Sequence, residues 1–356
     1  MISVYCRKFS QKESFMPLKI QKINIEKLFG YKDIKLNTKD ITVLVGKNGL
    51  GKTTILKIIN ALLSGNNDAP ELNLCDRASI IFSNQSEIVY DNIQSSFHID
   101  SEPAIKAFEV MLERLVKEKN ISKDDIDNGI RLRIESEEQK KYKFEIQYTP
   151  SKDIEHQWQI FNTKKEIVST PNTTLESVNK HSDICYISTL NLSANSLLDI
   201  DFGDGTEKNI LNLQLDIELD RLKHGSTKFI QRFIDTTSAL LRDSNKSLLI
   251  ENDDFTTIEH SNNQRLSIGK LSSGEKQLLY ILAKIANTKG RNTFLLMDEP
   301  EISLHLNWQE QLLKNIKNIN ENCQVLVVTH SPAIIMNGYM DTMIDMRDIS
   351  TGVKNG

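Results

Sequence analysis

The chain has 356 residues, with 44 lysines and arginines against 48 aspartates and glutamates, and a formal net charge of −4 at pH 7. This composition is that of an ordinary soluble protein, and the length suits one large domain or two modest ones. The mild acidity excludes a basic nucleic-acid footprint over the whole chain, although a local basic groove stays open. No apolar run approaches the roughly 18 residues of a membrane span, so we expect no membrane contact.

Residues 1–17 lack the continuous apolar core of a signal peptide, and we expect them to be a lead-in to the first strand. The cysteines are far apart and show no metal-ligand spacing: Cys6, Cys75, Cys185 and Cys323. Reduced thiols and a cytoplasmic location are therefore expected.

The next part of the chain, residues 18–75, begins a compact core. Short strands are predicted at 18–28, 31–36 and 41–45, and the apolar run "ITVLV" of the last one is typical of a fully buried strand. A glycine-rich turn follows, and residues 52–63 have helical spacing.

Residues 76–263 have a more polar texture, which we interpret as an inserted lobe of strands and helices. Helices are predicted near 103–118 and 226–243, and a buried strand at 183–190 returns towards the core. The acidic stretch "DFGDGTEKN" at 201–209 contains an Asp-Gly turn signal. Its carboxylates could hold a cation, but a solvated turn is the better explanation.

From residue 264 to 356 the pattern becomes compact again, and strands alternate with helices over short loops. This alternation indicates a parallel sheet. We therefore expect residues 18–75 and 264–356 to form one core that the lobe interrupts.

The segment "GKNGLGKT", from Gly46 to Thr53, fits G-x-x-x-x-G-K-[ST] between a buried strand and a helix. Its glycines let backbone N–H groups surround phosphate oxygens, and the helix N-terminus adds a positive end. Lys52 would reach the β and γ phosphates, and the Thr53 hydroxyl would bind Mg²⁺. The alternative, an ordinary glycine-rich turn, does not explain so many matched positions.

Two further motifs end predicted strands of the same sheet. "TFLLMDEPE" delivers adjacent carboxylates, of which Asp298 would hold Mg²⁺ and Glu299 would orient and deprotonate the attacking water. In "VLVVTHSP", His330 follows the next strand, where we expect contact with the γ-phosphate. Acidic residues at a solvated strand end and a structural histidine are the competing interpretations.

The fourth motif, "LSSGEKQ", places serines and a glycine at the start of an apolar helix pattern. Such a helix end can bind an anion. Ser272 and Glu275 also have the spacing of a capping box, and the two roles do not compete. The apolar face of this helix is expected to pack against the sheet: Leu278, Leu279, Ile281, Leu282 and Ile285.

Together these motifs resemble the ATP-binding-cassette (ABC) ATPases, in which "LSSGEKQ" corresponds to the signature sequence. The resemblance implies an α/β fold, with a mostly parallel sheet flanked by helices, an antiparallel N-terminal β part and the inserted lobe. It implies ATP and Mg²⁺ as ligands, with Lys52, Glu299 and His330 as catalytic residues and Thr53 and Asp298 at the metal. The expected nucleotide contacts are Gly46, Lys47, Asn48, Gly49, Leu50, Gly51, Lys52, Thr53, Thr54, Ser272, Ser273, Gly274 and Glu275.

In this family the signature faces the nucleotide of a second subunit, so the resemblance implies a homodimer or higher homo-oligomer with composite ATP sites. Ser303 and His305 are expected near the dimer axis. Phe29 and Tyr31 are candidates for stacking on the adenine or for core packing, and Gln85 is a candidate for the metal-sensing glutamine.

Three branches of the family compete. A transporter motor is disfavoured because the segment between Lys52 and the signature is long. A DNA-repair ATPase of the RecF and SMC type is favoured by Glu275, but the sequence shows neither coiled-coil heptads nor a clear basic stripe.

"DEPEISLHLNWQEQLL" most resembles the stand-alone ATPases related to the OLD family, many of which serve in anti-phage defence, although Leu306 replaces the usual proline. The chain ends soon after His330, so we expect a separate effector, a nuclease or toxin. Nucleic-acid or protein binding by the lobe stays open.

Overall fold

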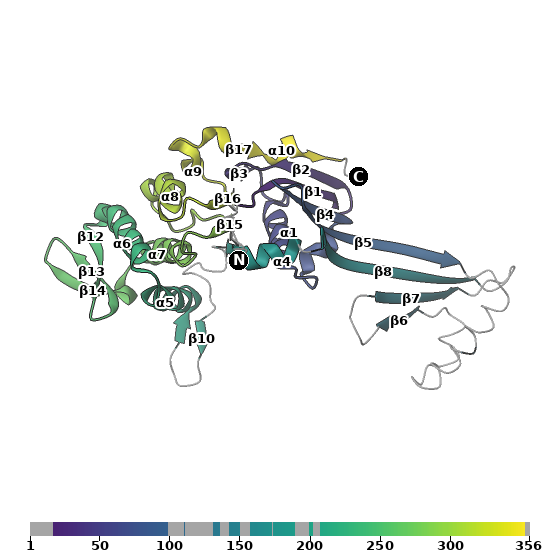
Figure 1. Ribbon diagram of the computed structural model, residues 1–356, viewed down its shortest axis with the longest axis horizontal. Helices are drawn as coiled ribbons and strands as arrows, with labels where there is room; N and C mark the ends of the chain where they lie inside the picture. The colour runs from purple at the N-terminus through teal and green to yellow at the C-terminus, as the bar shows by residue number, and fades with distance from the viewer. Residues whose placement is uncertain are drawn as a thin grey trace, which may run out of the picture.

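The computed structural model describes residues 17–98, 110, 131–135, 142–149, 157–172, 174–188, 199–201 and 207–352. In this part of the chain an antiparallel sheet, helix α1, a parallel sheet and a group of helices are stacked in layers (Figure 1). Cys6 and nearly all of the helix expected near 103–118 lie outside the described residues. None of the described helices combines the length and apolar character that a bilayer crossing requires.

The parallel sheet lies at the centre of these layers. Its strands, in spatial order, are β17 (Met343–Asp345), β3 (Ile41–Val45), β16 (Cys323–Val328), β15 (Asn292–Asp298) and β9 (Ser182–Ser188). Every residue of β16 is buried, as expected of a strand that is covered on both faces. The predicted parallel sheet is confirmed, including the buried strand that returns near residue 183.

The antiparallel sheet is built around the first strands of the chain. Its order is β18 (Ser350–Thr351), β2 (Lys32–Asn37), β1 (Ile20–Leu28), β4 (Arg77–Phe82), β5 (Glu87–His98), β8 (Gln157–Thr170), β7 (Tyr142–Thr149) and β6 (Arg131–Glu135). The long pair β5 and β8 extends away from the rest of the molecule (Figure 1).

Helix α1 (Lys52–Ser64) lies between the two sheets and buries most of its side chains there. Its apolar residues pack on one face of the parallel sheet, represented by Leu44, Phe294 and Leu326, and on the inner face of the antiparallel sheet. One hydrophobic core therefore joins the first strands of the chain to strands from its last third.

The opposite face of the parallel sheet is covered by helices that form the second hydrophobic core. They are α5 (Ile210–Lys223), α6 (Thr227–Leu241), α7 (Ser273–Ala286) and α8 (Leu306–Ile319). The five apolar residues predicted to hold α7 against the sheet are all fully buried. A small sheet of β12 (Lys246–Glu251), β13 (Asp254–Glu259) and β14 (Gln264–Ser267) lies beyond α6 (Figure 1).

Short elements complete the described chain. They are α4 (Thr174–His181), α9 (Ala333–Met336), α10 (Met346–Ile349), the hairpin of β10 (Asp199–Asp201) and β11 (Glu207–Asn209), and 3₁₀ turns at Pro70–Leu74, Arg242–Ser244, Ile268–Lys270 and Met340–Thr342. Cys75, Cys185 and Cys323 are buried free thiols, and burial raises the pKa of Cys185 to about 11.

The described part of residues 76–263, expected as one inserted lobe, is distributed over several places. β4 and β5 continue the antiparallel sheet from β1, β9 joins the parallel sheet, and α5 and α6 pack in the core beside α7. The segment therefore contributes strands and helices to the layers, and part of it also projects from them.

Candidate functional site

Three neighbouring strands of the parallel sheet end at the same edge. β3 leads into the phosphate-loop motif, β15 ends at Asp298, and β16 ends at Val328, just before His330. Leu44 pairs with Val328, and Val328 pairs with Asp298, so these ends lie side by side. The motifs therefore meet at the carboxyl edge of the sheet, where open α/β sheets bind their ligands.

The loop between β3 and α1 has a backbone shape that depends on glycine. Gly49 and Gly51 have left-handed φ values of 78° and 92°, which residues with a side chain rarely adopt. A Cβ atom at Gly51 would lie 2.8 Å from Cε2 of Phe29. The tip formed by Lys47, Asn48 and Gly49 is exposed. An exposed glycine loop that leads into a helix N-terminus suits phosphate oxygens.

Lys52 lies across this loop. Its Nζ donates to the carbonyl oxygens of Gly46 and Lys47 at 2.9 and 3.1 Å, and the residue is 5% exposed. Burial lowers the pKa of Lys52, and the carboxylates at positions 298, 299 and 301 oppose this shift. An ammonium group held between the loop and several carboxylates is well placed for an anionic ligand.

Thr53 and Asp298 form the candidate metal site. The Thr53 hydroxyl donates to Oδ1 of Asp298 at 3.0 Å, and Asp298 is fully buried at the strand end. Burial raises the pKa of Asp298, whereas the Thr53 hydrogen bond lowers it and Glu299 raises it further. A bound cation would stabilise the buried negative charge of Asp298. A hydroxyl beside a carboxylate is an oxygen donor set that Mg²⁺ accepts.

The described residues contain no cluster of three or more His, Cys, Asp or Glu side chains that could hold a metal ion by themselves. Mg²⁺ usually takes one or two protein ligands and completes its shell with substrate phosphates and water.

Glu299 and His330 face each other at the same edge. Oε1 of Glu299 lies 3.5 Å from Nε2 of His330, and the two side chains are 24% and 38% exposed. The backbone N–H of Glu299 donates to Val328 O at 2.8 Å, in a left-handed conformation with φ of 50°. The sheet thus fixes the backbone of the predicted base while its carboxylate reaches solvent.

The signature motif forms the N-terminus of α7. The predicted capping box is confirmed: Ser272 Oγ accepts from the Glu275 N–H, and Oε2 of Glu275 accepts from the Ser272 N–H. Oε1 of Glu275 binds Nζ of Lys246 from β12 at 2.8 Å. Ser272 is exposed, but Gly274 and Glu275 are buried, so the carboxylate of Glu275 is used within the chain.

The loop that follows Glu299 touches α7 directly. A Cβ atom at Gly274 would lie 2.2 Å from the carbonyl oxygen of Ser303, and Nε2 of the buried Gln277 donates to Pro300 O at 3.0 Å. These contacts tie the signature helix to the loop that carries Glu299, Ser303 and His305 within one chain.

The remaining candidates from the sequence are two aromatic residues and a glutamine. Phe29 packs against Gly51, whereas Tyr31 is half-buried beside Lys32, whose Nζ binds Leu50 O. Gln85 donates to Gln21 near the start of β1. The phosphate loop lies at the other end of that strand, roughly 24 Å away, so the structure does not bring Gln85 to the site.

Three residues that shape the site are not among those predicted from the sequence: Lys246, Gln277 and Glu301. Glu301 belongs to the motif "DEPE", yet its bonds to residues 329–331 depend on the pairing of β15 with β16. Gln277 is a polar residue at a buried position of an otherwise apolar helix pattern. Such an interruption is the signal in the sequence that could have pointed to it, because polar side chains are seldom buried without a partner.

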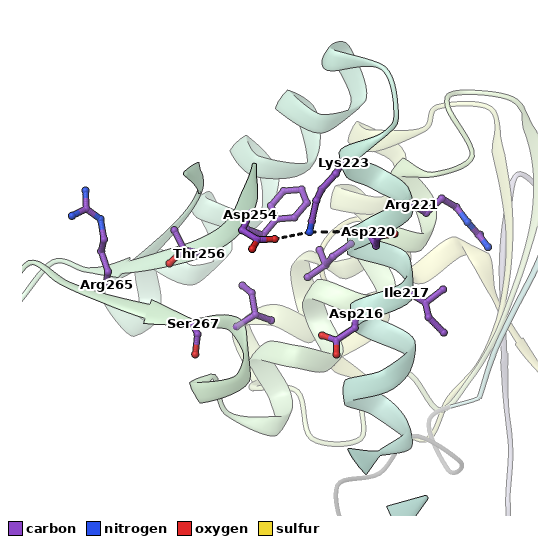
Figure 2. Close-up of a pocket in the computed structure, with 12 residues that line it drawn as sticks. Asp216, Ile217, Asp220, Arg221, Lys223, Asp254, Thr256, Arg265 and Ser267 are labelled. Atoms are coloured by element: carbon purple, nitrogen blue, oxygen red, sulfur yellow. Dashed lines mark hydrogen bonds and ion pairs between the residues drawn. The ribbon is translucent and has the colours of Figure 1, made fainter. Parts of the chain in front are cut away.

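A separate groove of about 890 Å³ lies between α5 and the β13–β14 hairpin (Figure 2). Lys223 spans it, with Nζ 2.5 Å from Asp254 and 3.8 Å from Asp220. Ile268, in the turn that leads to the signature, contributes to its lining. The groove is distinct from the phosphate-loop edge, which lies on other elements.

Comparison with known proteins gives the family of the chain. Residues 41–337 match the family model described as "AAA domain, putative AbiEii toxin, Type IV TA system". The chain belongs to this family. The match runs from β3 to the end of α9, and so includes every motif of the sheet edge. The family match and the relatives described below confirm the resemblance to ABC-type ATPases of the branch that includes defence ATPases.

Among curated relatives, the Septu protein PtuA of Bacillus thuringiensis is 23% identical over 345 residues, covering 92% of this chain and 75% of that protein. The retron Ec83 probable ATPase of Escherichia coli is 33% identical over 88 residues, or 22% of this chain and 16% of that protein. The retron Vc95 probable ATPase of Vibrio cholerae is 31% identical over 93 residues, or 23% and 18%.

Among solved structures, the SMC head domain from Thermotoga maritima is 12% identical, with a TM-score of 0.42 over 94% of this chain and 99% of that one. An SMC head bound to the C-terminal winged-helix domain of ScpA is 16% identical, with a TM-score of 0.43 over 94% and 97%.

The close approach of α7 to Ser303 predicts a steric effect of Gly274→Ala. The added methyl group would collide with the Ser303 carbonyl oxygen, and we expect the free energy of unfolding to fall by about 1–3 kcal/mol. Gly269→Ala is the matched control, because the nearest atom to its added Cβ, Ser267 Oγ, is 3.9 Å away. Chemical denaturation measures both, and equal stability of the two variants would contradict the close packing.

The buried pair of Lys246 and Glu275 predicts a pH-dependent contribution to stability. Burial alone would raise the pKa of Glu275, but the hydrogen bonds from Lys246 and Ser272 outweigh burial and hold the pKa below its ordinary value. Since the folded pKa lies below the unfolded one, the stabilisation is complete above the unfolded pKa. It is lost as the pH falls through the folded pKa.

We therefore expect Lys246→Met to lower the free energy of unfolding at pH 7 by roughly 3 kcal/mol, because it leaves a buried carboxylate unpaired. The deficit should shrink as the pH falls into the acidic range, because protonation of that carboxylate removes the buried charge that Lys246 compensates. Urea unfolding at several pH values measures this, with Lys270→Met, at an exposed lysine, as the control. A deficit that does not change with pH would rule out this pairing.

Proposed function

We propose that this chain is a Mg²⁺-dependent ATPase that closes around ATP as a homodimer or higher homo-oligomer and controls a separate effector. The observation that carries the proposal is the convergence of Lys52, Thr53, Asp298, Glu299 and His330 at one edge of the parallel sheet. The family match over residues 41–337 supports the assignment to ATPases.

Each residue has a role that its environment supports. Lys52 and the loop N–H groups bind the β and γ phosphates, and the oxygens of Thr53 and Asp298 are the ligands that would hold Mg²⁺. When bound, Mg²⁺ neutralises phosphate charge. Glu299 orients the attacking water and accepts its proton, and His330 stabilises the charge that develops on the transferred phosphoryl group.

Two features support a second copy as the donor of the signature serines. Lys52 and Ser272 begin helices that pack on opposite faces of the parallel sheet, α1 in one core and α7 in the other. Leu306, directly after His305, is 64% exposed, so its side chain is accessible to a second copy at the expected dimer axis.

Control of an effector in anti-phage defence is the finer part of the proposal. The resemblance of "DEPEISLHLNWQEQLL" to stand-alone defence ATPases and the relatives named for Septu and retron systems support it. In this view the chain acts in the cytoplasm, and residues 76–263 recognise the trigger or hold the effector, with nucleic acid as one candidate trigger.

Glu299→Gln tests the catalytic assignment. The amide cannot accept a proton from water, so kcat for ATP should fall at least about a hundredfold, while affinity for ATP changes little and closed dimers accumulate. Phosphate release, nucleotide binding and size-exclusion chromatography with ATP measure these effects. Glu321→Gln, at an exposed site far from the loop, is the control. Normal turnover in Glu299→Gln would show that Glu299 is not the base.

Co-expression with the products of neighbouring genes tests the effector. We expect the tagged chain to retain a nuclease or toxin in one nucleotide state and release it in another, and Lys52→Ala to abolish the difference because nucleotide binding is weakened. Pull-downs with and without ATP, together with phage plating, measure this. A setting among repair genes, with loss of DNA-damage survival but no loss of phage resistance, would favour the RecF and SMC type instead.

A further inference from the structure

One carboxylate oxygen of Glu301 accepts hydrogen bonds from all three residues of the segment 329–331, which carries His330. Oε1 of Glu301 accepts from Thr329 Oγ1 at 2.6 Å, from the His330 N–H at 2.8 Å and from the Ser331 N–H at 3.1 Å. Hydrogen bonds to an ionised acceptor are stronger than neutral ones. This arrangement leaves the backbone of residues 329–331 little freedom to move relative to Glu301.

We propose that Glu301 is the positioning residue that sets His330 for catalysis, an inference that rests on the proposed ATPase function. The His330 ring is 38% exposed, and its nearest charged partner, Oε1 of Glu299, is 3.5 Å away. That distance is too long for a firm hydrogen bond. The ring therefore takes its place mainly from its own backbone, which Glu301 holds.

Thr329 and Ser331, on either side of His330, are also bound to other parts of the core. The Thr329 N–H donates to Leu44 O at the end of β3, and its hydroxyl also accepts from the Ser331 N–H at 2.9 Å. Ser331 Oγ donates to Gln309 Oε1 at 2.6 Å. The segment is thus fixed between the strand that leads to the phosphate loop, helix α8 and Glu301.

Glu301 is itself held by two helices. Its carbonyl oxygen accepts from the Leu304 N–H at 2.9 Å and from Nε2 of Gln309 in α8 at 3.4 Å. Its neighbour Pro300 accepts from Gln277 in α7. The backbone that carries the Glu301 carboxylate is thus held by contacts with both α7 and α8.

Substitutions at Glu301 separate positioning from simple loss of structure. Glu301→Ala removes the acceptor, and we expect kcat for ATP hydrolysis to fall roughly tenfold. KM for ATP should stay within about twofold, because the hydrogen bonds lost are those to residues 329–331 and not to the phosphate loop. Glu301→Gln restores an acceptor oxygen and should recover most of the activity. Thr329→Val, which keeps the shape and removes one donor, should give a smaller loss in the same direction.

The deciding measurement is a double-mutant cycle with His330→Ala. If Glu301 acts through His330, then Glu301→Ala lowers kcat in the unaltered chain but adds no further loss in the His330→Ala background. Equal losses in both backgrounds, or unchanged kcat in the single variant, would overturn the proposal. Thermal unfolding of each variant identifies any that fails to fold, and if Glu301→Ala fails, the cycle is run with Thr329→Val.

Hydrogen exchange supplies a readout that is independent of activity. The amide protons of His330 and Ser331 should exchange faster in Glu301→Ala than in the unaltered chain, and Glu301→Gln should restore much of the protection. Unchanged exchange would overturn the anchoring role. If the unaltered chain hydrolyses no ATP, the proposed function fails as a whole, whereas normal hydrolysis with additive losses removes only the role of Glu301.

Discussion

The parallel pairing of β3, β16 and β15 is the constraint on which the candidate site depends. In this register Val43 pairs with Val327 and Met297 pairs with Val327, so the phosphate loop, Asp298 and Thr329 emerge together. Side chains of these strands alternate between the two hydrophobic cores. A slip by one residue would exchange the faces and separate the motifs, so burial on both faces holds the chemistry in register.

The loop from Glu299 to His305 is the second common element, because it contacts both halves of the proposed composite site within one chain. On one side Gly274 and Gln277 of the signature helix touch it, and on the other Glu301 holds the segment of His330. Glu299 and Ser303 have left-handed φ values of 50° and 69°. Non-glycine residues in that region persist where surrounding contacts define the conformation, as they do here.

Residues 76–263 contribute strands to the core, although their local sequence pattern differs from that of the core segments. Polar alternation separates residues 76–263 from the compact ends, yet β4 pairs with β1 and β9 pairs with β15. Strand partners so far apart in sequence leave no periodic signal, because periodicity reports which face is buried and not which strand lies beside it. The boundaries at 75 and 263 stay predictions for this reason.

The motifs could be located from the amino-acid order because each depends on local backbone geometry. Glycines mark the loop at 46–51, and the spacing of Ser272 and Glu275 marks a helix start, since these features require particular residues at short separations. The contacts of Lys246, Gln277 and Glu301 could not be located in this way. Their partners lie 23 to 30 residues away in sequence, and such pairs become neighbours only when buried strands and helices assemble into layers.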